Sequence, residues 1–164
     1  FKEADAGETI RQPFKLDIVI LEALSSLEPW LAEHKGSAKL RAPADLSGFG
    51  DPMLIRDALK NLIENGVKFA AEGRRCVELW TQRNADRVEI FVYDSGPGIP
   101  PEEREKVFEK FYQVESSFTG QVEGWGLGMP FVRKVAEKFG GSVRLESELG
   151  SGTTVVLSLP AADG

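Results

Sequence analysis

Hydrophobic residues recur with helical spacing in three parts of this chain. The first apolar stripe consists of Ile20, Leu24, Leu27 and Leu31. Asp17 is the expected N-cap of this helix, and Pro29 predicts a kink or an interruption before the helix ends at residues 34–36. A second helix is expected to begin at Asp51 and Pro52, an N-cap followed by a proline at the first helical position, and to extend to about Phe69.

The third helical stripe lies within and after the sequence GWGLGMP, residues 124–130. Its apolar members are Leu127, Phe131, Val132, Val135, Ala136 and Phe139. The stripe predicts a helix over residues 127–139, with Pro130 in its first turn and Gly140-Gly141 as its C-cap. The glycines would then form a loop that leads into a helix N-terminus, where unpaired N–H groups favour an anion such as phosphate. A surface linker before an ordinary helix explains the same glycines equally well.

Alternation of apolar and polar positions predicts two hairpins. One joins residues 76–83 to residues 87–94, and the other joins strands near residues 142–148 and 153–159. A short strand is expected at residues 37–41, whereas residues 95–123 contain one short helical stretch and otherwise have the pattern of a long, functional loop or lid. This order of elements predicts an α+β fold, a two-layer sandwich with helices on one face of a mixed sheet.

The composition is that of one soluble globular domain. The chain has 164 residues, of which 41% are hydrophobic and 28% are charged. Its net charge of −6 argues against nucleic acid or an anionic membrane as a partner of this segment. The single cysteine, Cys76, rules out an internal disulfide and suits a reducing compartment. No signal peptide or membrane-spanning run is recognisable, so we expect a cytoplasmic location, which is compatible with a membrane anchor elsewhere in a longer protein.

Two carboxamides and an ammonium group share one face of the second predicted helix. On a wheel of about 100° per residue, Asn65 and Lys68 fall within about 40° of Asn61. The apolar side of the same helix is formed by Ile55, Leu59, Leu62 and Gly66. A plain solvated face is the simplest explanation of such a polar stripe, but asparagine is a mediocre helix former and occurs here twice. An asparagine oxygen can bind Mg²⁺ beside nucleotide phosphates, which favours a functional face.

Asp94 ends a strand whose other residues on the same face are apolar. Val88, Ile90 and Val92 precede it at the two-residue period of a strand. A carboxylate at the edge of an apolar layer needs a hydrogen-bond donor. A turn in which Asp94 bonds to its own backbone would supply one, and so would the amino group of a purine.

Five stretches, in this order, resemble motifs of the catalytic, ATP-binding domain of bacterial sensor histidine kinases, within the wider gyrase, Hsp90, histidine kinase and MutL family of ATPases. NLIENGVKFA resembles the N box, DSGPGI the first glycine box, VFEKFY the F box, GWGLGM the second glycine box and GSGTT the glycine-threonine element that follows. The resemblance covers residues 8–160 and implies a Bergerat-type ATP-binding fold with an ATP lid. It divides the chain into a linker from a preceding dimerisation helix (1–13), the catalytic domain (14–160) and a tail (161–164).

The resemblance also implies roles for the matching residues. Asp94 would accept a hydrogen bond from the adenine amino group, with Thr153 in support. Asn65 would bind Mg²⁺, Asn61 would assist it and Lys68 would contact phosphate. Together Asn61, Asn65 and Lys68 would form the catalytic face of the helix.

In the second glycine box, Gly126 and Gly128 would offer backbone N–H groups to the triphosphate, and Leu127 would anchor this hinge of the lid. The remaining residues that the resemblance places around the nucleotide are Phe69, Gly96, Gly98, Ile99 and Gly124.

As a function, the resemblance implies a protein-histidine kinase module. It would bind ATP and Mg²⁺ and donate the γ-phosphoryl group to a histidine on a separate dimerisation and phosphoacceptor domain of the same full-length protein, which in turn acts on a response regulator. Its only histidine, His34, lies in the sequence HKG, which does not match the acceptor signature, and is expected to be a surface residue at a helix end.

Three departures from the family pattern leave an alternative open. Gln113 replaces an arginine that is common after the F box, and Trp125 and Pro130 replace small residues. The alternative is therefore a regulatory domain that binds nucleotide with a lid unsuited to catalysis. ATP hydrolysis of the gyrase type is disfavoured, because those relatives have a water-activating glutamate at the position of Asn61.

Overall fold

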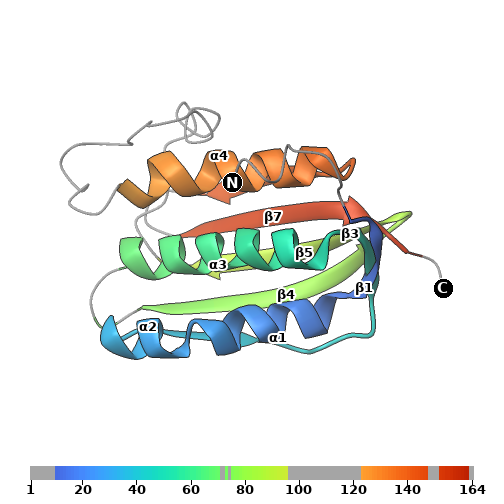
Figure 1. Ribbon diagram of the computed structural model, residues 1–164. Helices are drawn as coiled ribbons and strands as arrows, with labels where there is room; N and C mark the ends of the chain where they lie inside the picture. Colours follow the sequence, from blue (N-terminus) through green and yellow to red (C-terminus); the bar gives the residue numbers. More distant parts are fainter. Residues whose placement is uncertain (1–9, 71–72, 74, 96–122, 148–151, 163–164) are drawn as a thin grey trace.

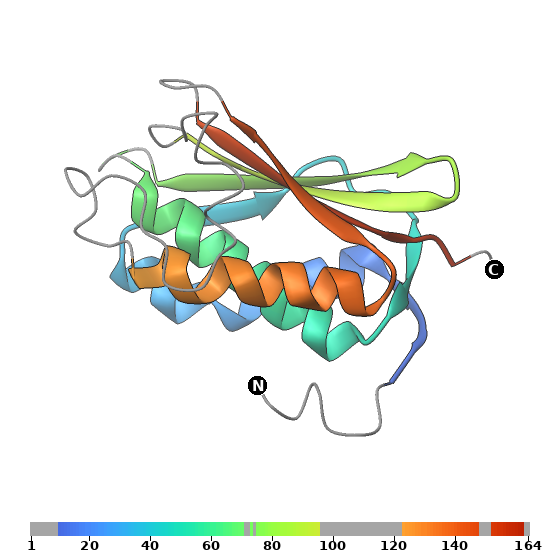
Figure 2. The same ribbon diagram turned by 90° about the horizontal axis from the view of Figure 1, so that it is seen from above.

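The computed structural model describes residues 10–70, 73, 75–95, 123–147 and 152–162 (Figure 1). In chain order its elements are β1 (Gln12–Lys15), α1 (Leu16–Ser26), α2 (Glu28–Glu33), β2 (Ser37–Leu40), β3 (Ser47–Gly50), α3 (Pro52–Phe69), β4 (Cys76–Asn84), β5 (Arg87–Asp94), α4 (Glu123–Lys138), β6 (Ser142–Ser147) and β7 (Thr153–Pro160). Helices α1, α3 and α4 lie side by side on one face of a sheet (Figures 1 and 2). The predicted two-layer α+β architecture is confirmed.

The main sheet has five strands in the order β2-β4-β5-β7-β6. β2 runs parallel to β4, and every other neighbouring pair is antiparallel, so the sheet is mixed as predicted. Both predicted hairpins are present. β5 is the central strand, and its two-residue period places Val88, Ile90 and Val92 in the core beneath the helices.

The ends of α3 and α4 follow the capping chemistry that the sequence predicts. The Asp51 carboxylate accepts a hydrogen bond from the Met53 N–H at 2.9 Å and so caps α3. At the end of α4, Gly140 has a φ of +78°, and the Gly141 N–H donates to the Ala136 carbonyl at 2.8 Å. This is the Schellman pattern that a terminal glycine allows.

The first helix differs from the prediction at its start. α1 begins at Leu16 with Lys15 in the N-cap position, so Asp17 lies inside the first turn instead of capping it. The reason is that β1 leads directly into the helix, and the Leu16 N–H donates to the Leu46 carbonyl at 3.0 Å. The interruption expected at Pro29 is confirmed, because α1 ends at Ser26 and α2 begins with Pro29 in its first turn.

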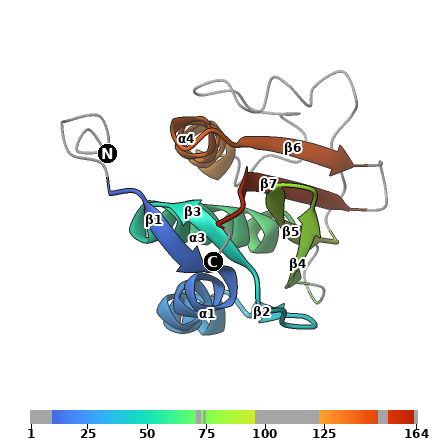
Figure 3. The ribbon, with the colours of Figure 1, turned by 90° about the vertical axis from the view of Figure 1, so that its right-hand side faces the viewer.

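Two short strands were not predicted. β1 and β3 form a separate antiparallel pair in which Pro13 lies opposite Phe49 (Figure 3). β3 is also bridged to Ala161 through Gly48, and the Ala162 N–H donates to the Ser47 carbonyl at 2.9 Å. This small sheet therefore joins the first and the last described segments of the chain.

The start of α4 is a second correction. The helix begins at Glu123, not near residue 127, so the backbone of GWGLGMP is helical and Pro130 lies inside the helix. Local propensity favours a loop for three glycines and a proline, but packing favours the helical phase. Met129, Val132 and Ala136 follow helical spacing and are all fully buried. The lid predicted between residues 95 and 123 lies almost wholly outside the described residues.

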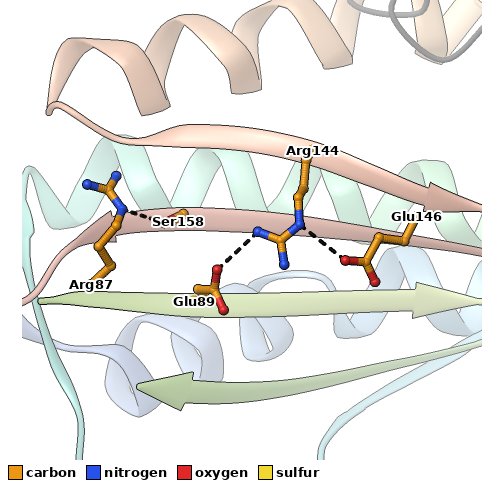
Figure 4. A network of polar contacts seen from close by, with 5 residues as sticks. All are labelled: Arg87, Glu89, Arg144, Glu146 and Ser158. Carbon is orange, nitrogen blue, oxygen red and sulfur yellow. Dashed lines mark hydrogen bonds and ion pairs between the residues drawn. The ribbon is translucent and has the colours of Figure 1, made fainter. Parts of the chain in front are cut away.

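The sheet face opposite the helices is covered by its own long side chains. The Arg144 guanidinium of β6 reaches across β7 to the buried Glu89 of β5 at 3.0 Å, and its Nε bonds to Glu146 at 3.1 Å (Figure 4). Hydrogen bonds and charge from Glu89 and Glu146 raise the pKa of Arg144, although burial opposes them. Beside this network, the ring of Trp80 stacks on Phe91 with a centroid separation of 5.3 Å. These contacts allow polar and aromatic residues to be buried without a third layer.

Candidate functional site

Four elements begin or end together at one end of the molecule. α3 and β5 have their C-terminal ends there, and α4 and β7 begin there (Figures 1 and 2). Asp94, the last residue of β5, lies opposite Thr153, the first residue of β7. Two predicted site residues that are far apart in sequence are therefore brought together by strand pairing.

Asp94 is a buried carboxylate. Its side chain continues the apolar face of β5, as predicted, and only 8% of the residue is exposed. On the helix side it packs against Gly66 of α3, where a Cβ would lie 3.2 Å from the Asp94 Cβ. Thr153 is buried beside it, with 3% exposed. A buried carboxylate favours ligands that donate hydrogen bonds, because its charge is otherwise costly to remove from water.

Gly152 closes the other side of Asp94. Its φ is +89°, a backbone conformation that favours glycine, and any Cβ there would overlap the carbonyl oxygen of Asp94 and approach the Tyr93 ring at 3.1 Å. The chain entering β7 is thus in direct contact with the end of β5. Asp94 is thus in close contact with two glycines, Gly66 of α3 and Gly152 just before β7.

Asn65 is the most deeply buried of the three polar residues on α3. Only 6% of it is exposed, and its Nδ2 has no hydrogen-bond partner among the described residues. Buried amide groups are nearly always hydrogen-bonded, so the partner of this one lies beyond the described residues, as a water molecule or a ligand would. Asn61 and Lys68 are half-buried, and the Asn61 Nδ2 donates to the Asp57 carbonyl of its own helix at 3.2 Å. The polar stripe is therefore not a uniformly solvated face.

Residues 50–163 match the family described as histidine kinase-, DNA gyrase B-, and HSP90-like ATPase. The chain belongs to this ATPase family. Sensor-like histidine kinase SenX3 of Mycobacterium bovis is 34% identical over 146 residues, which cover 89% of the chain and 35% of that relative. The chain therefore spans about a third of the length of SenX3.

Two solved structures share the fold of this ATPase-family chain. The ATP binding domain of PrrB from Mycobacterium tuberculosis has a TM-score of 0.73 and 27% identity, and the match covers 93% of the chain and 98% of that domain. Full-length ShkA, solved in complex with AMPPNP, has a TM-score of 0.79 and 27% identity over 97% of the chain and 33% of ShkA. These matches identify the chain as the catalytic, ATP-binding type of domain found in sensor histidine kinases.

The structure brings together only part of the predicted site of this ATPase domain. Asp94, Thr153, Asn65 and the half-buried Lys68 lie near the shared end of α3, β5 and β7. Gly96, Gly98 and Ile99 lie outside the described residues. For Phe69, Gly124, Gly126, Leu127 and Gly128 the structure describes a helical backbone.

The helical second glycine box changes which N–H groups are available. In an α-helix the fourth residue donates the first intrahelical hydrogen bond, as Ile55 does to the Asp51 carbonyl in α3. In a helix that begins at Glu123, the N–H of Gly124 therefore stays available to an anion, whereas that of Gly126 is engaged. The N–H of Gly128 lies beyond the first four residues and would be engaged within the helix. In this form of the domain, the helical backbone therefore leaves neither Gly126 nor Gly128 with a free N–H for the predicted triphosphate contacts.

Two residues of the site were not singled out from the sequence. Gly66 counted only as part of the apolar face of the helix, and Gly152 only as part of GSGTT. A glycine in a helix interior lowers stability by about 1 kcal/mol relative to alanine, so a glycine at such a position indicates that another part of the molecule approaches the backbone closely.

In the described part of the chain, no three His, Cys, Asp or Glu side chains group as a metal site. Within the same ranges, no helix has the length and apolar character needed to cross a membrane.

Proposed function

We propose that this domain binds ATP with Mg²⁺ and donates the γ-phosphoryl group to a histidine on a phosphoacceptor domain of the same full-length protein, which in turn acts on a response regulator. One observation carries the proposal. The buried, unpartnered amide of Asn65 lies next in sequence to Gly66, and Gly66 is packed against the buried carboxylate of Asp94. A hard amide ligand and a carboxylate acceptor at one end of a sheet suit the two ends of a metal nucleotide.

Asp94 would recognise the base. With C6 of the purine turned toward it, this carboxylate would accept a hydrogen bond from the 6-amino group of adenine but not from the 6-carbonyl group of guanine, so it would favour adenine over guanine. Its pairing with Thr153 and its contact with Gly66 fix the place of this acceptor. The ShkA structure, which holds the ATP analogue AMPPNP, supports a nucleotide of this kind.

Asn65 would hold the metal, with Asn61 near it on the same helix face. The amide can turn so that Oδ1 faces a cation, without giving up any described hydrogen bond of Nδ2. Bound Mg²⁺ would neutralise charge on the phosphate oxygens. Lys68 would add a positive charge one helical turn further along.

Transfer to a histidine would need little help from a general base. A neutral imidazole already carries a lone pair near neutral pH, so positioning and electrostatics provide most of the catalysis. An amide at position 61 cannot take a proton from water, and this favours phosphoryl transfer over hydrolysis.

Calorimetric titration of two variants tests the proposal. We expect Asp94→Asn to weaken ATP binding by about 1.5 to 3 kcal/mol, the range for a hydrogen bond to a charged group, and to leave the affinity for inorganic triphosphate unchanged. We expect Asn65→Ala to remove the Mg²⁺ dependence of ATP affinity. It should keep the fold, because deleting a buried, unpartnered amide relieves a desolvation cost.

Two results would contradict these roles. Undiminished ATP affinity in Asp94→Asn would exclude this carboxylate from base recognition. If Asn65→Ala still bound ATP more tightly with Mg²⁺ than with a chelator, the metal would be held by another residue.

A further inference from the structure

Gly66 is a point of direct contact between α3 and the two neighbouring strands β4 and β5. A Cβ on Gly66 would lie 2.8 Å from Cγ2 of Val77 and 3.2 Å from Cβ of Asp94. The first distance is shorter than real Cβ contacts, and the second is tighter than most of them. A side chain at this position must therefore shift Val77, move α3 away from the sheet or displace Asp94.

The backbone of Asp94 is closely packed as well, because any Cβ on Gly152 would overlap its carbonyl oxygen. Gly152 already abuts the Asp94 carbonyl, and it lies close to the ring of Tyr93. Close-packed interiors transmit a change of one methyl group instead of absorbing it. The close approach of α3 to Asp94 thus depends on the absence of a side chain at Gly66.

We propose that Gly66 is a positioning residue that sets the spacing between Asp94 and Asn65, and through it the preference of the site for the base of a nucleoside triphosphate. This inference rests on the proposed function. Asn65 precedes Gly66 on α3, whereas Asp94 belongs to β5, so a shift of α3 relative to β5 changes the distance between the two polar groups. A nucleotide must satisfy both groups at once, with its base at one and its metal-bound phosphates at the other.

Gly66→Ala tests this directly. The measurement is the affinity of the purified domain, by calorimetry in Mg²⁺, for ATP and for inorganic triphosphate. We expect the preference for ATP over triphosphate to fall about tenfold, part of the loss expected when a charge-assisted hydrogen bond is misplaced. The affinity for triphosphate should stay at the wild-type value, because Asn65 stays on the same helix.

Gly36, which lies between α2 and β2, is a matched control because it packs against Val67, the residue after Gly66 on α3. A Cβ on Gly36 would lie 2.8 Å from Cγ1 of Val67, and its three nearest atoms belong to Val67 and Arg75. Gly36→Ala therefore creates an equally tight valine contact against α3 without Asp94 among its nearest atoms. It should lower the melting temperature as Gly66→Ala does, while the preference for ATP is retained.

The double variant Gly66→Ala/Val77→Ala separates stability from positioning. It relieves the 2.8 Å contact with Val77 and leaves the 3.2 Å contact with Asp94. We expect its melting temperature to recover toward that of Val77→Ala alone, while the preference for ATP stays low. This variant also keeps the test available if Gly66→Ala does not fold.

Three results would overturn the inference: an unchanged preference for ATP in both Gly66 variants, the same loss of preference in Gly36→Ala, or recovery of the preference together with stability in the double variant. Failure of the proposed function would look different. In that case the wild-type domain would show no preference for ATP over triphosphate, or would keep it in Asp94→Asn.

Discussion

Asp17 is a carboxylate whose surroundings disfavour its charge. Burial raises its pKa above the ordinary value of 3.8, a hydrogen bond from the Ala44 backbone opposes the rise, and the nearby charge of Asp45 adds to it. Its Oδ1 is buried without a partner among the described residues. The folded state therefore holds the proton more tightly than the unfolded chain does, and the contribution to stability falls as the pH rises through the raised pKa.

We accordingly expect Asp17→Asn to be more stable than the wild type at neutral pH. The advantage should shrink as the pH falls through the raised pKa and disappear below 3.8, where the wild-type carboxyl is protonated in both states. Urea denaturation over this pH range provides the measurement. Glu22→Gln is the matched control, since it removes an exposed carboxylate from the same helix and should show no such advantage. An Asp17→Asn variant that is less stable at neutral pH would contradict the expectation.

Among single residues, the sequence was informative where a polar group interrupted an apolar pattern. Asp94 stood out for this reason, and its place on the buried face is confirmed. Gly66 could not stand out in the same way, because it has no side chain and merged with the apolar side of the helix. Its contact with Asp94 depends on how α3 lies across β5, which no pattern within either segment specifies.

Substitution of Pro130 distinguishes a start of α4 at Glu123, as in the structure, from the start near residue 127 that the sequence predicted. If the helix begins at Glu123, Pro130 removes an interior hydrogen bond, and Pro130→Ala should stabilise the domain by about 1 to 3 kcal/mol. If the helix began near residue 127, the same substitution would be nearly neutral, because a first-turn N–H has no helical partner. Chemical denaturation measures the difference, and amide exchange of residue 126 and its neighbours would report the local change.

The elements that the sequence predicted well have long, uninterrupted periodicity. α3 keeps its apolar stripe through Ile55, Leu59 and Ile63, and the β4–β5 hairpin alternates over most of its length. β1 and β3 have only four residues each, and they contain Pro13, Gly48 and Gly50, which weaken any strand signal. β1 and β3 form because they pair with each other, and the hydrophobic pattern within either segment does not indicate this pairing.

The histidine content of the whole chain leads to a further prediction. His34 ends α2, its ring stacks on Trp30 at 4.0 Å, and its Nδ1 lies 2.9 Å from the Trp30 carbonyl. Its own carbonyl accepts a hydrogen bond from Arg75 at 3.1 Å. These contacts give His34 a structural role at a helix end, so the domain alone has no suitable phosphoacceptor.

We therefore expect the isolated domain to acquire no stable phosphohistidine and to release almost no ADP when it is incubated with Mg²⁺ and radiolabelled ATP. Adding a phosphoacceptor domain with its histidine should allow labelling of that domain, because catalysis here is mainly positioning and electrostatics. ATP binding without any such labelling would favour the regulatory alternative. Label on the isolated chain that disappears in His34→Gln would contradict the assignment of His34.

β3 pairs with β1 and is bridged to Ala161, so it determines where the domain can be attached to a surface or a label. Ile10 precedes β1, and Ala162 follows the bridge at Ala161, so both attachment points lie at the β3 end of the sheet. β7 has eight residues, which places about 25 Å of strand between that end and Thr153. A sensor surface or a fluorophore attached at either of these two points would leave the opposite end of the sheet, where Asp94 lies, open to ligands.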